Sequence, residues 1–434
     1  MYTLTIMAAK SHFSRVMITG VGVVSPVGIG KDAFWSRLLA GRSGIGFLKA
    51  FSSDRLPCRL AAEIENFDPQ NYVRKRKLLK VMSRDIQLGV SAAALAMSDA
   101  RLNQGDFDPD RLGVVYGAGR IPTAPRELDE AAASCARDGS FDFSLFGEEC
   151  LGQISPLWLL PQLPNMPASH VSIEHDARGP NNTITCREAS ALLALAEAVS
   201  TIQRGAADCM IVGACGSDVH PLNIARMMLE EHLSRRADPE KACRPFDIDR
   251  DGCIPGEGAA ALIIEDYDFA RRRGAEIYAE VLAAAGGCDG RGYQNGAGGT
   301  GLVRSIDAVL RKSGLLPRAI GHINAHGKST RRDDLVEARA YSRALGDAAE
   351  SVPVTGLKSY FGTFDAGAGA VELAASVLAL RHGVVPCTLN YENPDPLCRL
   401  NVIRREPLPV KNLTALSVNR SGIGQSAAAV IRAL

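Results

Sequence analysis

The 434-residue sequence lacks the features that mark several classes of protein. It contains no run of about 18 uncharged apolar residues, so we predict no membrane-spanning helix. Neither sign of charge dominates, because the chain has 49 Lys and Arg residues and 48 Asp and Glu residues. A strongly basic nucleic-acid-binding protein and a disordered acidic chain are therefore not indicated. Aromatic residues make up only 6% of the chain, whereas glycine and alanine are abundant, which favours close packing of helices against sheets.

The cysteines do not form a pattern that holds a metal ion or builds a disulfide framework. There are eleven of them, an odd number, and they are scattered without a C-x-x-C pair. We therefore predict no metal site and a reducing, cytoplasmic location. Residues 1–14 are predicted to form an irregular N-terminal extension, because their apolar run is too short for a secretory signal.

Apolar strands alternate with helical patterns along the rest of the chain. Residues 16–25 form an apolar run that ends in a Gly/Pro loop, and residues 85–100 carry apolar side chains at helical spacing. A strand, an alanine-rich helix and a second strand are predicted over residues 181–214, and the same order returns nearer the C-terminus. This alternation predicts an α/β layered fold.

Three short motifs need no functional explanation. The Gly20-Val-Gly22 turn lacks the third glycine of a dinucleotide-binding loop, so we interpret it as structural. His322 and His326 lie four residues apart on a predicted strand, where that spacing covers about 13 Å and is too long for one metal ion. The basic run at residues 74–77 is either a solvated helix face or a surface that attracts an acidic partner.

A series of longer motifs resembles a single family. In chain order the motifs are ITGVGVVSPVG, GRSGI, GPN, RGAADCMIVGA, RPFDIDRDGCIPGEGAAALIIED, RRRGAEIYAEV, INAHGKST, LKSYFG, GAVELAASVLALRHGVVPCTLN and NRSGIG. By these motifs the chain is identified as a member of the β-ketoacyl-acyl-carrier-protein synthase (ketosynthase) family of the thiolase superfamily. The resemblance runs from about residue 15 to residue 434.

The resemblance implies a fold and a domain organisation. We expect a thiolase-like five-layered αβαβα fold made of two similar halves, at residues 15–268 and 269–434. Insertions around residues 120–170 are expected to cap the pocket, and a dimer is expected to form through a strand near residues 182–186.

The resemblance also implies a reaction. In such enzymes a cysteine at a helix N-terminus accepts an acyl chain from the phosphopantetheine of an acyl carrier protein, and two histidines promote decarboxylation of the malonyl unit. A helix N-terminus suits this task because it lowers the pKa of a thiol and supplies N–H groups to an oxyanion. No cofactor beyond the carrier protein, no metal, no nucleic acid and no membrane are implied. The pathway is fatty acid or polyketide biosynthesis.

The residues at the expected catalytic positions depart from the family pattern. Counting forward from Gly179-Pro180, or back from Gly205, puts Glu188 at the nucleophile position, with Cys186 two residues too early. A glutamate cannot run the condensation, because attack on a thioester would give an anhydride. The first histidine matches His326 and the family lysine matches Lys358, but Thr363 stands where the second histidine is expected.

The pocket is expected to be remodelled as well. Ser421 and Ile423 occupy the positions of two gating phenylalanines in the loop after Asn419, and Arg420, Lys328 and Asp365 add charges nearby. The positive end of a helix and nearby cationic side chains would keep the Glu188 carboxyl ionised, whereas burial would favour its protonated form. Asp334 and Glu337 are retained as structural residues. The charged network either serves a function or only fills an obsolete cavity.

Three functional hypotheses follow. The first is a non-condensing subunit similar to a chain length factor, paired with an active ketosynthase paralogue as a heterodimer, or a homodimer. The second is a malonyl-carrier-protein decarboxylase in which a protonated Glu188 mimics an acylated cysteine and His326 polarises the thioester. The third is an active 3-oxoacyl synthase that uses Cys186 as its nucleophile.

Overall fold

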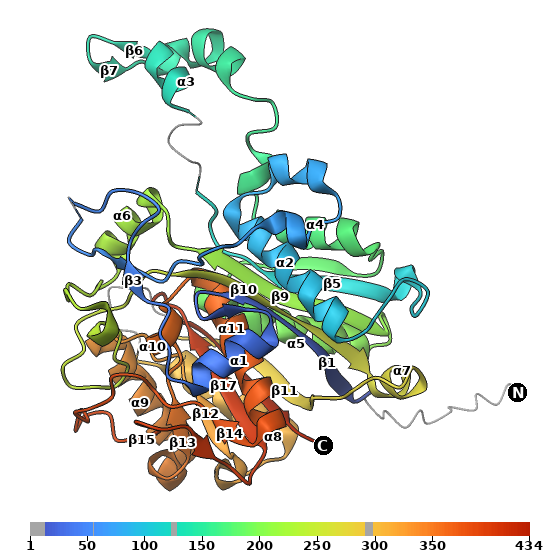
Figure 1. Cartoon of the computed structure of the whole chain (residues 1–434). Helices are drawn as coiled ribbons and strands as arrows, with labels where there is room; N and C mark the ends of the chain where they lie inside the picture. The colour runs from blue at the N-terminus through green and yellow to red at the C-terminus, as the bar shows by residue number, and fades with distance from the viewer. Residues whose placement is uncertain (1–13, 55, 123–127, 291–297) are drawn as a thin grey trace, which may run out of the picture.

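The computed structural model describes residues 14–54, 56–122, 128–290 and 298–434 (Figure 1). The predicted duplication is visible in these residues. The main elements follow the order β-α-β-α-β-α-β-β, and this order occurs twice along the chain. The first copy consists of β1 (Val16–Ser25), α2 (Arg84–Asp99), β5 (Leu112–Gly117), α4 (Met166–His175), β8 (Asn181–Ile184), α5 (Ser190–Gln203), β9 (Cys209–Ser217) and β10 (Glu257–Asp266).

The second copy repeats this order and its strand directions. It consists of β11 (Ala279–Cys288), α8 (Thr300–Ser313), β12 (His322–Asn324), α9 (Arg331–Leu345), β13 (Pro353–Thr355), α11 (Asp365–His382), β17 (Thr414–Arg420) and β18 (Gln425–Arg432). In both halves two antiparallel pairings are followed by two parallel ones, along β1-β10-β9-β5-β8 and β11-β18-β17-β12-β13.

The two halves share one hydrogen-bonded sheet. Each half holds a mixed sheet, and Val16–Ile18 of β1 pair antiparallel with 279–281 of β11 and join the two into twelve strands. The halves meet along β1 and β11, and the sheet ends at β8 on one side and at β15 (Asn401–Val402) on the other. β8 therefore carries one unpaired strand edge.

Helices form three layers around the two halves of the sheet. α2 and α4 lie outside the first half, α8 and α9 outside the second, and α5 and α11 lie between them (Figure 1). The predicted five-layered αβαβα fold is therefore confirmed. α11 is buried over residues 366–380, and Gly367 lets it approach the sheet, because a Cβ there would lie 2.5 Å from the Gly258 carbonyl oxygen.

Shorter elements connect the layers. The helices are α1 (Lys31–Leu39), α3 (Asp129–Ser134), α6 (Pro221–Glu230), α7 (Tyr267–Arg272) and α10 (Lys358–Phe361). The strands are β2 (Gly28–Ile29), β3 (Gly46–Phe47), β4 (Leu60–Ala61), β6 (Ala136–Arg137), β7 (Ser140–Phe141), β14 (Val384–Val385) and β16 (Leu408–Pro409). No helix in the described part of the chain is long and apolar enough to cross a membrane.

One expectation about the pocket is wrong for part of the chain. Residues 120–170 were predicted to cap the pocket, but residues 128–159 project away from the body (Figure 1). The reason is that this segment has a small core of its own, built on Ala131, Cys135, Cys150 and Ile154. Only the following residues, from about 160 to α4, return to the body.

Candidate active site at the N-terminus of α5

A sharp turn places Glu188 at the start of α5. Arg187 has a left-handed backbone with a φ of 52°, a conformation that is costly for a residue with a side chain and that often occurs at functional sites. The turn is held by Ser190, whose Oγ accepts from the Cys186 N–H at 2.8 Å and donates to the Arg187 carbonyl at 2.6 Å. Asp365, at the start of α11 in the second half, has the same feature with a φ of 45°. The two turns occupy equivalent places in the duplicated fold.

Glu188 is buried and forms an ion pair. Only 3% of the residue is exposed, and its Oε1 accepts from Lys328 Nζ at 2.7 Å. Lys328 Nζ also donates to Glu231 Oε1 at 2.9 Å, and Arg187 Nε lies 4.0 Å from Glu188 Oε2. The cluster of Arg187, Glu188, Glu231 and Lys328 is called the charged plug below.

The charged plug keeps Glu188 ionised. Burial alone would raise the pKa of this carboxyl, but the charges of Lys328 and Arg187 outweigh it and lower the pKa to about 2. In the same way, burial would lower the pKa of Lys328, but Glu188 and Glu231 raise it well above its ordinary value. The opposing influences predicted for Glu188 are thus resolved in favour of the carboxylate.

This ion pair has a consequence in acid. The pKa of Glu188 is lower in the folded chain, about 2, than its ordinary value of 4.5, so its stabilising contribution is complete above pH 4.5 and is lost as the pH falls toward 2. We expect the stability difference between the wild type and Glu188→Gln to shrink by about 2 kcal/mol from pH 7 to about pH 3. Urea unfolding of both proteins measures it, and a difference that stays constant with pH would contradict the assignment.

The Cys186 thiol has no described hydrogen bond to the charged plug. Its side chain is partly exposed and packs against the apolar core. Burial raises the pKa of its thiol, and Cys288 raises it further. A thiol in this state carries little of the thiolate that attacks thioesters. None of the described hydrogen bonds or ion pairs joins Cys186 to His326.

His326 lies next to Lys358, as the sequence predicts. The Lys358 Nζ is 3.3 Å from the ring Nδ1 of His326 and donates to its carbonyl oxygen at 2.7 Å. Burial and the cations of Lys358, Lys328 and Arg420 lower the pKa of His326 well below its ordinary value, so its ring is neutral near pH 7. Glu337 accepts from the His326 N–H at 2.7 Å and so holds the loop that carries it.

Thr363 and Asp365 lie in the equivalent turn of the second half. Thr363 is buried, and its Oγ1 has no hydrogen-bond partner. Burial raises the pKa of Asp365, and the negative charge of Glu188 raises it further. Asp365 lines an open pocket of about 260 Å³ together with Arg187 and Arg226. No group of His, Cys, Asp and Glu in the described residues could hold a metal ion.

The predicted gate loop is only partly in the pocket. Arg420 is buried, donates to Asp333 at 2.9 Å and lies 3.8 Å from Asp289. Ser421 is buried in a tight turn, but the Ile423 side chain is 43% exposed. The turn therefore leaves Ile423 at the surface, and its role as a gate of the pocket stays a prediction.

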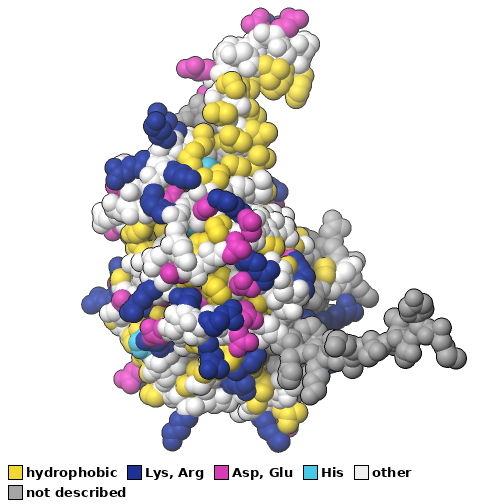
Figure 2. Space-filling model, turned by 90° about the vertical axis from the view of Figure 1, so that its right-hand side faces the viewer, with side chains coloured by type: hydrophobic (Ala, Val, Ile, Leu, Met, Phe, Trp, Pro, Cys, Tyr) yellow, Lys and Arg dark blue, Asp and Glu magenta, His cyan; other side chains and the backbone are white. Residues whose placement is uncertain are grey.

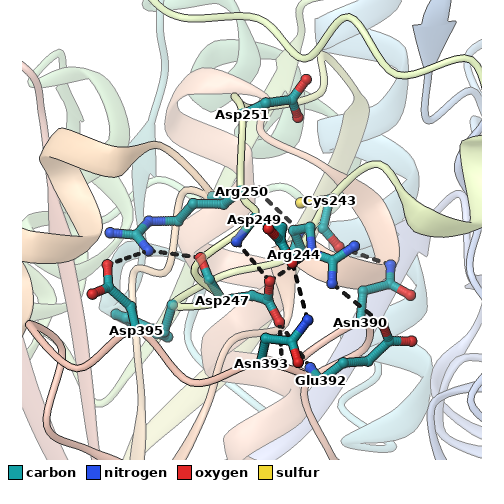
Figure 3. Close-up of polar contacts among 12 residues, drawn as sticks. Cys243, Arg244, Asp247, Asp249, Arg250, Asp251, Asn390, Glu392, Asn393 and Asp395 are labelled. Carbon is teal, nitrogen blue, oxygen red and sulfur yellow. Dashed lines mark hydrogen bonds and ion pairs between the residues drawn. The ribbon is translucent and has the colours of Figure 1, made fainter.

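Arg250 and Asp334 hold the scaffold behind the site, and Figure 3 shows Arg250 beside Asp395. Arg250 Nε lies 3.3 Å from Asp334 Oδ2 and donates to the Thr330 carbonyl at 3.1 Å, and Arg250 Nη1 donates to Asp395 at 2.8 Å. Asp334 also accepts from the Ser329 N–H at 3.0 Å. The loop from β12 to α9, which carries His326 and Lys328, is thus fixed to the loop before β10.

Sequence reasoning did not find two acidic partners of the site. Glu372 accepts from Lys358 and from Asn419 Nδ2, and its position in an otherwise apolar helix was a usable signal. Glu231 follows α6 in a charged stretch, where nothing in the local sequence distinguishes it. Glu231 lies 97 residues from Lys328 in the chain, whereas Glu372 lies 14 residues from Lys358.

Comparisons with known proteins agree with this geometry. The model of the beta-ketoacyl synthase N-terminal domain matches residues 13–270, and that of the C-terminal domain matches residues 278–392. The chain is similar to 3-oxoacyl-[acyl-carrier-protein] synthase 2 of Synechocystis, with 35% identity over 91% of this chain and 92% of that protein.

Two solved structures of the same fold each align with 97% of this chain. One is a type II polyketide synthase acyl-carrier protein in complex with its ketosynthase, with a TM-score of 0.84, 29% identity and 99% of that chain covered. Another is the ishigamide ketosynthase/chain length factor, with a TM-score of 0.85, 25% identity and 99% of that chain covered.

Proposed function

Because the chain belongs to the beta-ketoacyl synthase family of fatty acid and polyketide synthesis, we propose that it is a non-condensing subunit similar to a chain length factor. The observation that carries the proposal is the ion pair of Glu188 with Lys328 at the start of α5. A carboxylate held by a lysine at 2.7 Å offers no stable acyl acceptor.

The opposite side of the site supports the same conclusion. Thr363 has a hydroxyl that can donate a hydrogen bond, but this group neither takes up a proton nor becomes positively charged near neutral pH, so it cannot replace an imidazole. His326 is neutral and can donate a hydrogen bond, but it stands without a second histidine. Two of the three catalytic positions implied by the family resemblance therefore lack the necessary chemistry.

The pKa shifts of Glu188 and Cys186 oppose the two alternative hypotheses. A decarboxylase that uses a protonated Glu188 requires an acid form, whereas Lys328 and Arg187 lower the pKa of Glu188 to about 2. A synthase that uses Cys186 requires a thiolate, whereas burial raises the pKa of that thiol. Incubation of the protein with malonyl carrier protein tests the first alternative, and carbon dioxide release above the blank would favour it.

Acyl transfer to the protein tests the proposal directly. We expect no acyl adduct when the wild type is incubated with an acyl carrier protein that bears a fatty acyl chain, as measured by intact-protein mass spectrometry. Glu188→Cys should accept the chain at least about tenfold faster than the wild type, because Lys328 would lower the pKa of the new thiol. Cys186→Ala is the matched control and should leave the wild-type result unchanged. An adduct on Cys186 of the wild type would overturn the proposal.

We further propose that the partners are an acyl carrier protein and a complete ketosynthase in the cytoplasm. The exposed basic run at residues 74–77 suits an acidic carrier protein. The eleven cysteines are free, as expected in a reducing compartment. Acyl groups would arrive on the phosphopantetheine of the carrier protein. A complete ketosynthase would supply the chemistry that Glu188 and Thr363 cannot.

A further inference from the structure

The projecting segment of residues 128–159, here called the arm, has two cysteines in its small core. The arm carries α3, β6, β7 and several short helical turns, and it stands clear of the body in Figure 1. The buried residues of its core are Ala131, Cys135, Cys150 and Ile154. Cysteines therefore supply half of the buried residues of this core, although the whole chain of 434 residues has only eleven of them.

The backbone of the arm brings the two cysteines together. Cys135 follows the last residue of α3, and Cys150 ends the helical turn Phe146–Cys150. Between them β6 and β7 form a hairpin, and the Asp142 N–H donates to the Cys135 carbonyl oxygen at 2.8 Å. The chain thus reverses its direction, so that α3 contacts the helical turn that carries Cys150. A link between the two side chains would close a loop of residues 135–150.

The two thiols are neighbours inside this core. Both cysteines are buried, and they belong to one cluster of contacting side chains. Burial raises the pKa of the Cys150 thiol, and the charge and the hydrogen bond of the Cys135 thiol raise it further. While the core is closed, the Cys150 thiol is therefore protonated and reacts slowly. Two adjacent thiols form a disulfide once one of them has been oxidised, because the other can attack its sulfur.

The apolar core of the arm contributes little to its stability. Chain segments shorter than about 40 residues rarely stay folded without a disulfide, a metal ion or a partner surface. Figure 2 shows hydrophobic side chains gathered below the tip of the arm, where they face water. The large apolar side chains that remain exposed are Phe141, Phe143, Leu151, Leu157 and Leu159. A link between Cys135 and Cys150 would supply a constraint that the core lacks, because it restricts the opened chain.

We propose that Cys135 and Cys150 are a redox-active pair, which a peroxide oxidises to a disulfide that cross-links the arm. The peroxide oxidises one thiol to a sulfenic acid and leaves as water. The second thiol then attacks that sulfur, so that the S–S bond forms, the S–O bond breaks and a second water leaves. Two thiols and one hydrogen peroxide thus give one disulfide and two waters. In a reducing compartment, exchange with small thiols restores the pair, as in disulfides that report oxidation.

Opening of the arm gives the peroxide access to the pair. A core of four buried residues opens more readily than the large core between the sheet and α11, because few apolar contacts hold it. Opening removes the burial that raises the pKa of the Cys150 thiol, so the reactive thiolate becomes available. The disulfide then makes further opening rarer. Oxidation therefore changes the arm from a readily opened segment to a persistently folded one, and this change is independent of the missing acyl acceptor.

Peptide mapping of the oxidised wild type tests the proposal. Arg137 is the single Lys or Arg residue of the arm, so trypsin yields the peptides 127–137 and 138–178, each with one cysteine. After treatment with hydrogen peroxide and alkylation of the remaining thiols, mass spectrometry should find these peptides joined, and dithiothreitol should separate them. A non-reducing gel should show single chains. The proposal is overturned if both peptides are alkylated while the exposed Cys288 is oxidised, or if the link joins two copies.

The rate at which trypsin cuts the native protein after Arg137 is a second readout. Arg137 is exposed in β6, inside the loop that the disulfide closes. Oxidation should slow this cut at least about tenfold, because the linked arm opens less often. Cys150→Ser should be cut equally fast with and without peroxide, whereas Cys288→Ser, the matched control at an exposed cysteine outside the arm, should behave like the wild type. An oxidised wild type that is cut as fast as the reduced one would show that the link does not hold the arm closed.

Discussion

Lys328→Met is expected to lower the free energy of unfolding by about 3–5 kcal/mol, because it leaves buried carboxylates without their cation. Lys328 is 2% exposed and donates to Glu188 at 2.7 Å and to Glu231 at 2.9 Å. The methionine fills a similar volume, so the loss reports the charge and not a cavity. Urea unfolding at pH 7 measures the change.

A double variant separates the ion pair from other effects of the substitution. Glu188→Gln combined with Lys328→Met removes both partners, and it should be less destabilised than Lys328→Met alone. We expect a coupling of about 1–3 kcal/mol between the two positions. Lys411→Met, at an exposed lysine, is the matched control and should change stability by less than about 0.5 kcal/mol. Strict additivity of the two single changes would contradict the charged plug.

Arg250→Met is the second change with a large expected effect, again about 3–5 kcal/mol or loss of the folded protein. The Arg250 guanidinium is buried and joins Asp334, Asp395 and three backbone carbonyls, as Figure 3 shows in part. Without it, the carboxylate of Asp334 and these carbonyls would be left with fewer partners in a buried site.

Arg250→Lys keeps this second prediction testable if the methionine variant does not fold. Lysine preserves the charge but not the planar fork of donors, so we expect an intermediate loss of stability. Thermal unfolding of both variants ranks their stabilities against the wild type. Arg318→Met, at an exposed position, is the control. A lysine variant as stable as the wild type would mean that charge alone holds the loop from β12 to α9.

The two predictions together describe how the site tolerates its charges. Arg250 and Asp334 fix the loop that carries Lys328, and Lys328 then neutralises Glu188 at the start of α5. A buried charged group is stable only where its partner is held in place. Arg250, Asp334, Lys328 and Glu188 are therefore parts of one arrangement, which is why the pocket can carry charge without unfolding the chain.

Much of the fold follows from local sequence patterns. The apolar run at residues 16–25 and the helical spacing at 85–100 correspond to β1 and α2, because burial selects one period for strands and another for helices. The motifs that resemble the ketosynthase family predicted the five layers, and the order of elements confirms them. The chain position of Glu188 at a helix N-terminus was also predictable, since it required only counting from Gly179-Pro180.

Other features depended on contacts between distant residues. The pairing of β1 with β11, which joins the two halves into one sheet, leaves no local signal. Ile423 was expected in the pocket and lies at the surface, because the tight turn after Ser421 decides its direction. The insertions around residues 120–170 were expected to cap the pocket, whereas residues 128–159 of them fold around a small core of their own.

The sequence by itself determined which elements form and how they are ordered, and it predicted which residues stand at the catalytic positions of a ketosynthase. Only the tertiary structure decided whether Glu188 is an acid or a carboxylate. Its partner Lys328 is 140 residues away in the chain, and the pKa of a buried carboxyl depends on the charges that the fold brings within a few ångströms of it. Hydrophobic periodicity is a local property of the chain, whereas the distance between two charged side chains is a property of the folded molecule.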